Sequence, residues 1–272
     1  MFRSPLEYCV SVWVTIPSAR PLPEVETFVA KWRSMGYLVA LRRDLGAALP
    51  DCDHLQYGEY HGYAKACNGL IRDVMRLDSD AQWFVTGGDD TLPDPNKRAD
   101  LIGFECARHF GEKQGVYREE LTAMCDQSGS RTQMGRFNWS TFGVMQPTGD
   151  RYAGGSIDRI AGSPWIGREF AERAYGGNGP YWPEYKHMFV DEEIREVALK
   201  LGVYWMRPDL VHLHMHFMRE SAALDSKAIA KFIPPHLIEA NSPAHWNKFK
   251  ALYESRKAAG FPGHEVREAV LA

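Results

Sequence analysis

The chain has 272 residues and a formal net charge of −3, with 44% hydrophobic and 25% charged residues. This composition is typical of a globular protein with a sizeable core, and it excludes a surface that coats DNA generally. No apolar run approaches about 20 residues and no signal-peptide core is visible, so we expect a soluble, cytoplasmic protein. The five cysteines lack C-x-x-C spacing, which predicts reduced thiols.

The first half of the chain alternates predicted strands with predicted helices. In chain order we expect a strand at 8–16, a helix closed by Gly36, a strand at 37–41, an irregular segment at 47–61, a helix at 62–77, a strand at 83–85 and a third helix that Asp94 caps, with Pro95 as its first residue. This alternation predicts an α/β fold with a mostly parallel central sheet flanked by helices.

The second half is richer in loops. We expect strands at 115–118 and 142–146, helices at 165–174 and 191–201, an extended segment at 203–217 and a mostly helical tail from 225. Two long polar or glycine-rich loops, 148–162 and 176–187, separate these elements. Loops of this length in a compact domain usually bind ligands, so we expect them beside a functional site.

An acidic turn, Asp89-Asp90, directly follows the buried strand at 83–85 and two glycines. Ligands of open α/β sheets bind at the carboxyl ends of the strands, and glycines there let a ligand approach the backbone. Carboxylates are hard oxygen ligands that suit Mg²⁺ or Mn²⁺ carrying a diphosphate. The alternative is an ordinary solvated turn between a strand and a helix.

Three motifs together resemble the donor half of GT-A fold glycosyltransferases, and most of all the large inverting family 2. They are Val10-Ser11-Val12 with Ile16-Pro17, Gly62-x-Ala64-x-Ala66-x-Asn68-Gly69-Leu70, and Asp89-Asp90-Thr91-x-Pro93. The resemblance covers roughly residues 9–217. It implies a catalytic domain over 1–220, with a nucleotide-sugar-binding half at 1–110 and an acceptor-binding half at 111–220. Residues 221–272 would form a C-terminal helical extension, which is similar to that of small phage-encoded transferases.

The resemblance implies a metal-bound nucleotide-diphosphate sugar as donor. Asp90 falls on the family's metal-binding aspartate, for Mn²⁺ or Mg²⁺, and Gly88 stands where the first aspartate usually lies, so Asp89 is expected to contact the ribose. The acidic motif after the second strand is absent, and Asp44 stands near its place. The full set of implied donor-binding residues is Pro17, Ser18, Arg20, Asp44, Gly62, Lys65, Asn68, Gly88 and Asp89.

A second acidic block, Asp191-Glu192-Glu193, begins the predicted helix at 191–201. In the family an aspartate at this place is the general base, which Asp191 matches, although Val190 replaces the usual glutamate before it. A carboxylate at a helix start stays ionised and can accept a proton from a hydroxyl. The alternative is acids that match the helix dipole. Implied acceptor-binding residues are Trp165, Arg168, Tyr181, Trp182 and Glu192.

Three histidines alternate with strand period, which predicts that His212, His214 and His216 share one face of a strand. The resemblance implies that His214 completes the metal shell opposite Asp90. One alternative function is a zinc-dependent hydrolase that uses all three histidines, although the chain has no H-E-x-x-H motif. Another is a non-catalytic nucleotide- or glycan-binding module, in which Trp165, Tyr181 and Trp182 are stacking platforms.

The expected function is metal-dependent transfer of a sugar from a nucleotide-diphosphate donor to an acceptor hydroxyl, with inversion. A UDP-sugar is the expected donor. The acceptor is expected to be a glycan, a small molecule or a modified base in DNA.

Overall fold

The computed structural model describes residues 10–115, 118–125, 131–138, 140–152, 154–216 and 235–264. The elements of its first half are β1 (Ser11–Pro17), α1 (Leu22–Ser34), β2 (Leu38–Arg43), β3 (His54–Tyr57), α2 (Tyr63–Leu77), β4 (Ala81–Val85), β5 (Thr91–Leu92) and α3 (Ala99–Lys113). The elements of the second half are β6 (Arg118–Cys125), β7 (Arg131–Asn138), β8 (Val144–Pro147), η1 (Gly154–Arg159), β9 (Trp165–Gly167), α4 (Arg168–Arg173), η2 (Ala174–Gly177), α5 (Val190–Lys200), β10 (Tyr204–Arg207), β11 (Leu213–His214), α8 (Pro235–Ala240) and α9 (Pro243–Ala258).

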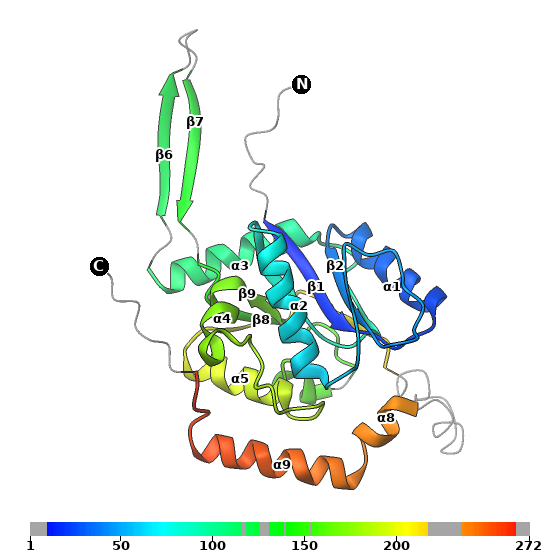
Figure 1. Cartoon of the computed structure of the whole chain (residues 1–272). Coiled ribbons are helices and arrows are strands. Elements are labelled where there is room, and N and C mark those ends of the chain that lie inside the picture. The colour runs from blue at the N-terminus through cyan, green and yellow to red at the C-terminus, as the bar shows by residue number, and fades with distance from the viewer. Residues whose placement is uncertain are drawn as a thin grey trace.

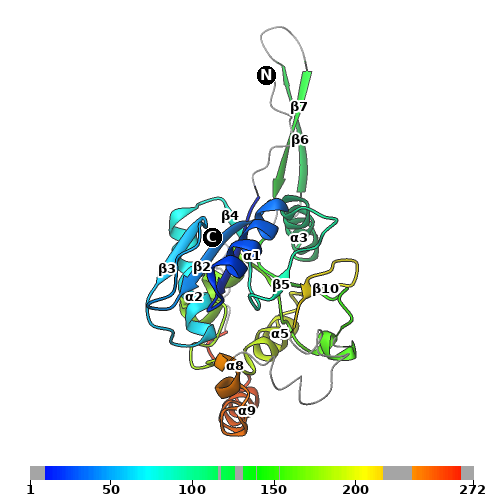
Figure 2. The same cartoon turned by 90° about the vertical axis from the view of Figure 1, so that its right-hand side faces the viewer.

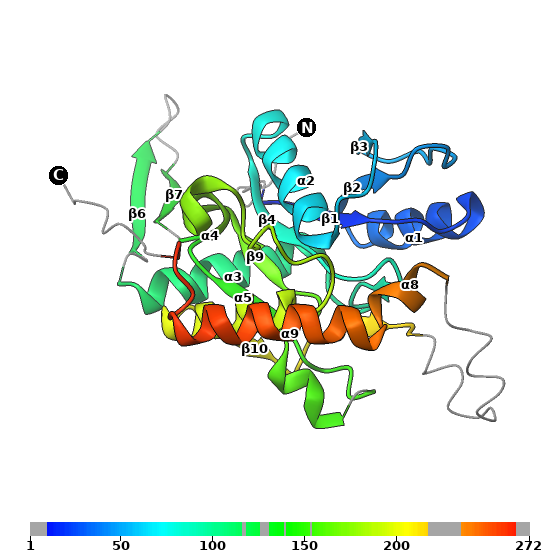
Figure 3. The same cartoon turned by 60° about the horizontal axis from the view of Figure 1, so that its bottom comes forward.

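The main sheet of the described residues has seven strands in the order β10-β8-β9-β4-β1-β2-β3. β1 pairs in parallel with β2 and β4, β2 with β3, and β8 with β10. Only β9 runs against its neighbours, β4 and β8. Figure 3 shows α2 on one face of the sheet and α1 and α3 on the other. The predicted α/β fold, with a mostly parallel sheet, flanking helices and a C-terminal helix, is confirmed.

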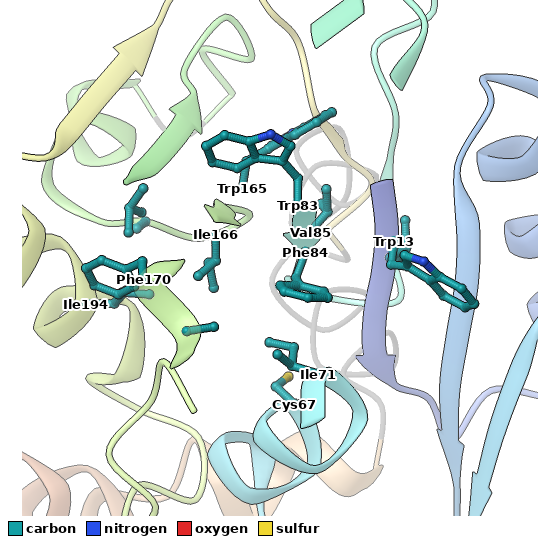
Figure 4. Packing of buried hydrophobic residues seen from close by; sticks show 14 of the residues in the cluster. Trp13, Cys67, Ile71, Trp83, Phe84, Val85, Trp165, Ile166, Phe170 and Ile194 are labelled. Carbon is teal, nitrogen blue, oxygen red and sulfur yellow. The ribbon is translucent and has the colours of Figure 1, made fainter. Parts of the chain in front are cut away.

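The core lies on both faces of β4, whose residues alternate between the two helix layers. Figure 4 shows Phe84 directed towards Cys67 and Ile71 of α2, with Trp83 on the other side of the strand. All four side chains are fully buried. On the Trp83 side, Gly103 allows α3 to approach closely, because a Cβ atom there would lie 2.8 Å from Val10 Cγ1. The apolar run at 83–85 is thus a central strand that is covered on both faces, as its sequence predicts.

Three sequence predictions differ from the structure. The segment 47–61 contains β3, a parallel edge strand whose partial exposure gives it no apolar run. Asp94 does not cap α3, because its Oδ1 atom accepts from the backbone N–H groups of Asn96 and Lys97 and the helix begins later, at Ala99. Trp165 belongs to β9 rather than to a helix, and only α4 follows it.

The last helix, α9, packs against α5 through a buried ion pair. Arg256 Nη2 lies 2.7 Å from Glu193 Oε1, and the two side chains are 7% and 2% exposed. The hydroxyl groups of Tyr175 and Tyr185 also donate to the Glu193 carboxylate. A buried carboxylate needs such partners, since an unpaired charge in the interior is costly. The expected domain boundary at residue 220 lies outside the described residues.

Two elements mark opposite ends of the molecule. The hairpin β6–β7 projects from the body at one end, and α9 lies at the other (Figures 1 and 2). Figure 1 also shows that β1 ends and α2 begins on the side where α9 lies. Among the described residues, no helix combines the length and the apolar content that a membrane crossing requires.

Candidate functional site

The carboxyl ends of β1 and β4 form the switch point of the sheet. The chain leaves β1 through α1 to β2 on one side, whereas β4 pairs with β1 on the other. At such a point the connections diverge and leave a crevice, which is where open α/β sheets bind ligands. Ser18 follows β1 and the acidic turn, Asp89-Asp90, follows β4. The topology therefore brings together two of the segments that the sequence predicts to bind the donor.

Asp89 is fixed by the loop that follows β1. Ser18 Oγ donates to Asp89 Oδ2 over 2.7 Å, and Arg20 Nε lies 3.0 Å from Asp89 Oδ1. The loop is itself held by Arg43, a buried residue whose guanidinium donates to the backbone oxygens of Ser18 and Arg20 over 2.7 and 2.9 Å. Sequence reasoning missed Arg43. A charged residue that closes a buried strand was the signal for it.

Asp90 contacts His214, although the two residues are far apart in the sequence. His214 Nε2 lies 3.2 Å from Asp90 Oδ1. Burial raises the pKa of the Asp90 carboxyl, but His214 outweighs it, and with Arg20 and His216 holds that pKa below its ordinary value. Asp90 is therefore an anion at neutral pH.

Backbone pairing explains why His214 reaches the acidic turn. β11 pairs antiparallel with β5, which directly follows the turn, so that His214 stands opposite Thr91. Met215 N donates to Asp90 O over 2.7 Å, and the N–H of His214 donates to Asp150 Oδ2 over 2.9 Å. The predicted pairing of Asp90 with His214 in space is thus present.

Gly88 makes room for the Asp90 carboxylate. A Cβ atom at Gly88 would lie 2.3 Å from Asp90 Oδ1, far inside contact distance. Its neighbour Gly87 has a φ of 143°, which a side chain rarely adopts, and it packs against the backbone of Gly162 and Ser163. Both glycines therefore shape the acidic turn, Gly88 by leaving space and Gly87 by its conformation.

The carboxylate of Asp90 and the imidazole of His214 fit a hard divalent cation whose other ligands come from a bound substrate. A carboxylate oxygen and an imidazole nitrogen suit Mn²⁺ or Mg²⁺, which fill their remaining positions with phosphate oxygens and water. No group of three or more His, Cys, Asp or Glu side chains in the described ranges is arranged to hold a metal by itself. Asp90 and His214 would consequently supply two ligands, and a diphosphate would supply others.

The three histidines do not share one face, contrary to the prediction. His212 is buried, where Trp165 Nε1 donates to its Nε2 over 3.3 Å and its Nδ1 lies 3.1 Å from Ser163 Oγ. His214 and His216 have rings 5.0 Å apart and stand at the surface beside Asp90. β11 comprises only two residues, so strand alternation does not extend over the whole segment. The zinc-hydrolase alternative loses its three-histidine cluster.

Asp191 and Glu192 form a carboxylate pair at the start of α5. Burial, together with the neighbouring Asp191 carboxyl, raises the pKa of Glu192 to about 9. The buried Oε2 of Glu192 meets no N–H or O–H donor among the described residues. Glu192 is therefore protonated at neutral pH.

The start of α5 lies close to the segment that packs on the acidic turn. The backbone oxygen of Asp191 accepts from the N–H of Ala161 over 3.2 Å. The next residue, Gly162, packs on Gly87, where a Cβ atom would lie 3.2 Å from Gly162 O. The backbone of Asp191 is therefore joined to the end of β4 through this short segment.

Several other predicted site residues have packing roles. Asn68 exchanges two hydrogen bonds with the backbone of Tyr181, so both are buried and the Tyr181 ring is no open platform. Trp165 is fully buried, and the Trp182 ring lies under the Arg256 guanidinium at 3.7 Å. Gly62 precedes α2 with a φ of 104° and packs on Lys186.

Arg168 lies at the wrong edge of the sheet for an acceptor site. Its guanidinium donates to the backbone oxygens of Met75, Asp78 and Ala81, at the beginning of β4. These carbonyls include the last ones of α2, which cations at a helix C-terminus stabilise. The sequence cannot distinguish this role from substrate binding.

The remaining donor-site candidates lie at the carboxyl edge or near it. Pro17 ends β1, opposite Arg42 of β2. Asp44 follows β2, and its charge, like that of Asp89, contributes to a raised pKa of Tyr60, which burial mainly causes. Lys65 instead lines a separate pocket with residues of α9, and none of that pocket's lining residues belongs to the acidic turn.

A comparison of the sequence with models of known protein families finds no match, and no curated protein matches it. Any function must therefore follow from the geometry of the site.

Proposed function

We propose that the protein is a metal-dependent glycosyltransferase of the GT-A type, which moves a sugar from a nucleotide diphosphate to an acceptor hydroxyl. The proposal depends on one observation, namely the contacts that Asp89 and Asp90 make at the switch point of the sheet. Asp89 is held by Ser18 and Arg20 from β1, and Asp90 meets His214 at 3.2 Å. A nucleotide sugar needs a polar contact for its ribose and a cation for its diphosphate, and the two aspartates offer one of each.

The residues divide the chemistry between them. Asp90 and His214 would hold Mn²⁺ or Mg²⁺, which when bound neutralises the charge that develops on the departing nucleotide diphosphate. Arg20, 3.0 Å from Asp89, adds a fixed positive charge at the same edge. Asp89 accepts a hydrogen bond from Ser18 and keeps lone pairs for the ribose hydroxyls.

Asp191 would act as the general base. Its carboxylate accepts the proton of the acceptor hydroxyl while the hydroxyl oxygen forms a bond to the anomeric carbon. The bond between that carbon and the diphosphate oxygen breaks, and the nucleotide diphosphate leaves with the electron pair. Attack opposite the leaving group inverts the configuration. Glu192 follows Asp191 in α5, and because its pKa is raised to about 9 it is protonated at neutral pH and is not the base in this proposal.

The test begins with binding and ends with turnover. UDP-glucose, UDP-galactose and UDP-N-acetylglucosamine are screened by thermal shift with and without Mn²⁺, and a stabilisation that requires both the nucleotide and the cation is expected. Each stabilising donor is then incubated without an acceptor. Slow release of free sugar supports an enzyme, whereas binding with no release favours a non-catalytic module. Stabilisation that is equal with and without the cation contradicts the metal-dependent proposal.

A further inference from the structure

A second pocket, distinct from the switch point, is lined by basic side chains from three segments. It has a volume of about 380 Å³ and lies between the start of α2, the segment before α5 and α9. The pocket is lined by Lys65 of α2, by Lys186 from the segment before α5, by Lys248 of α9 and by His61. We call this site the lysine pocket. Its volume is within the range of pockets that hold small ligands.

No ion pair within 4.0 Å joins Lys65, Lys186 or Lys248 to a carboxylate in the described part of the chain. One acid, Glu184, lines the same pocket and offsets one of the three positive charges. The lining of the pocket therefore carries a net positive charge, which an anion in the pocket would balance.

The chemistry of the lining favours a phosphate group. A phosphate monoester carries a charge of roughly −1.5 to −2 and three strong acceptor oxygens, and lysine ammonium groups bind it as point charges. A single carboxylate has less charge to offer three cations. Phe249 and Leu252 of α9 also line the pocket, and these apolar side chains would contact the carbon framework of the ligand.

One residue connects the lysine pocket with the acidic turn. The backbone N–H of Tyr63 donates to Lys186 O over 2.6 Å, and its side-chain hydroxyl donates to Gly87 O over 3.3 Å. The pocket and the turn therefore lie at the two ends of a single tyrosine. We propose that the lysine pocket binds the phosphate group of a phosphorylated acceptor and so positions the acceptor's hydroxyl beside the transferred sugar. The acceptor part of this proposal rests on the proposed function.

The test uses inorganic phosphate as the probe and needs no donor sugar. Isothermal titration with phosphate in EDTA is expected to show saturable binding to the wild-type chain. Lys248→Ala and Lys186→Ala should each weaken it about tenfold, the size expected for one charge-assisted hydrogen bond. Lys250→Ala is the matched control, because Lys250 is exposed on the same helix and does not line the pocket. Its affinity should equal that of wild type. Since Lys186 and Lys248 are exposed, both variants should keep the wild-type melting temperature.

Three results would overturn the proposal. The first is the absence of saturable phosphate binding. The second is equal weakening of that binding by Lys248→Ala and Lys250→Ala. The third is a loss of Mn²⁺-dependent UDP binding in Lys248→Ala, which would make the pocket part of the donor site. Failure of the proposed function looks different. The wild-type chain would then bind phosphate in the lysine pocket and show no Mn²⁺-dependent UDP binding at all.

Discussion

His214 Nε2 lies 3.2 Å from Asp90 Oδ1, and this contact joins the turn after β4 to a strand from the far end of the α/β core. The pair has the oxygen and nitrogen donors of a divalent-metal site. It is also an acid–base contact that is satisfied without a metal. A cation that enters must therefore break this contact, so its affinity depends on the diphosphate that accompanies it.

The first prediction concerns this pair. Asp90→Ala should remove the Mn²⁺-dependent part of UDP binding, because the carboxylate is the charged member of the donor set. His214→Ala should raise the Mn²⁺ concentration that gives half-maximal activity, and His216→Ala, the matched control, should raise it less. Titrations of Mn²⁺ at fixed UDP-sugar measure both effects. Full activity in Asp90→Ala would contradict the metal site.

The second prediction uses the space at Gly88. A methyl group there would lie 2.3 Å from Asp90 Oδ1, so Gly88→Ala must push the carboxylate out of place. We expect a loss of Mn²⁺ affinity of roughly 10–100-fold, as for other changes that reorient a metal ligand. The melting temperature without ligand should change little, since the turn is at the surface. Gly155→Ala is the control, because a Cβ atom at that glycine meets nothing within 4 Å.

The third prediction separates the two carboxylates of α5. Asp191→Asn keeps the shape and loses the proton acceptor, which typically costs ~10²–10⁴-fold in turnover, with donor binding unchanged. Glu192→Gln replaces a protonated carboxyl by a neutral amide that still donates a hydrogen bond. It should keep most of the activity at neutral pH. Single-turnover transfer and UDP titration measure the two quantities. An inactive Glu192→Gln with an active Asp191→Asn would exchange their roles.

The fourth prediction is a pH dependence of stability. Burial lowers the pKa of His212 to about 4 from 6.5, so between these values the unfolded chain binds a proton that the folded chain does not. The contribution of His212 to the free energy of unfolding should therefore fall as the pH is lowered from 6.5 to 4, by up to about 1.4 kcal/mol per pH unit. The raised pKa of Glu192 acts in the opposite direction over part of this range, so the contribution of His212 is read as the difference in slope between the wild-type chain and a variant that cannot titrate at this position. Urea denaturation at several pH values measures the slope.

The matched variant for that slope is His212→Gln, which cannot titrate. In this variant the free energy of unfolding should fall less as the pH is lowered, because one proton fewer is taken up on unfolding. Part of the slope will remain, because burial also lowers the pKa of His264, to about 3. An unchanged slope in His212→Gln would show that His212 titrates alike in both states.

The sequence predicted most of the strands and helices of the α/β core, although it assigned the short buried strand β9 to a helix. It found the acidic turn because two carboxylates follow a fully buried strand. It missed β3, whose residues are half-exposed at the sheet edge and form no apolar pattern. It also predicted an acceptor-binding role for Arg168, whose guanidinium instead contacts backbone oxygens at the end of α2. The sequence alone does not distinguish these two roles of an arginine. Spatial neighbours decide such roles, and they are set by tertiary structure.

The same limit applies to the histidines. Strand period alone predicts a shared face for His212 and His214, yet the structure buries the His212 ring in the core against Trp165 and leaves His214 exposed beside Asp90. The lysine pocket was likewise invisible in the sequence, since Lys65 and Lys248 come from opposite ends of the chain. The proposed donor and acceptor assignments remain predictions for the experiments above.

The ion pair between Arg256 and Glu193 has a consequence for the synthesis of the protein. Translation proceeds from the N-terminus, so β1, β4 and the acidic turn leave the ribosome long before α9. Until Arg256 emerges, Glu193 lacks this ion pair and α5 lacks its contact with α9. His214 and Lys248 also arrive late in the chain. A nascent or prematurely terminated chain would therefore contain Asp89 and Asp90, but neither His214, the proposed second metal ligand, nor the α9 side of the lysine pocket.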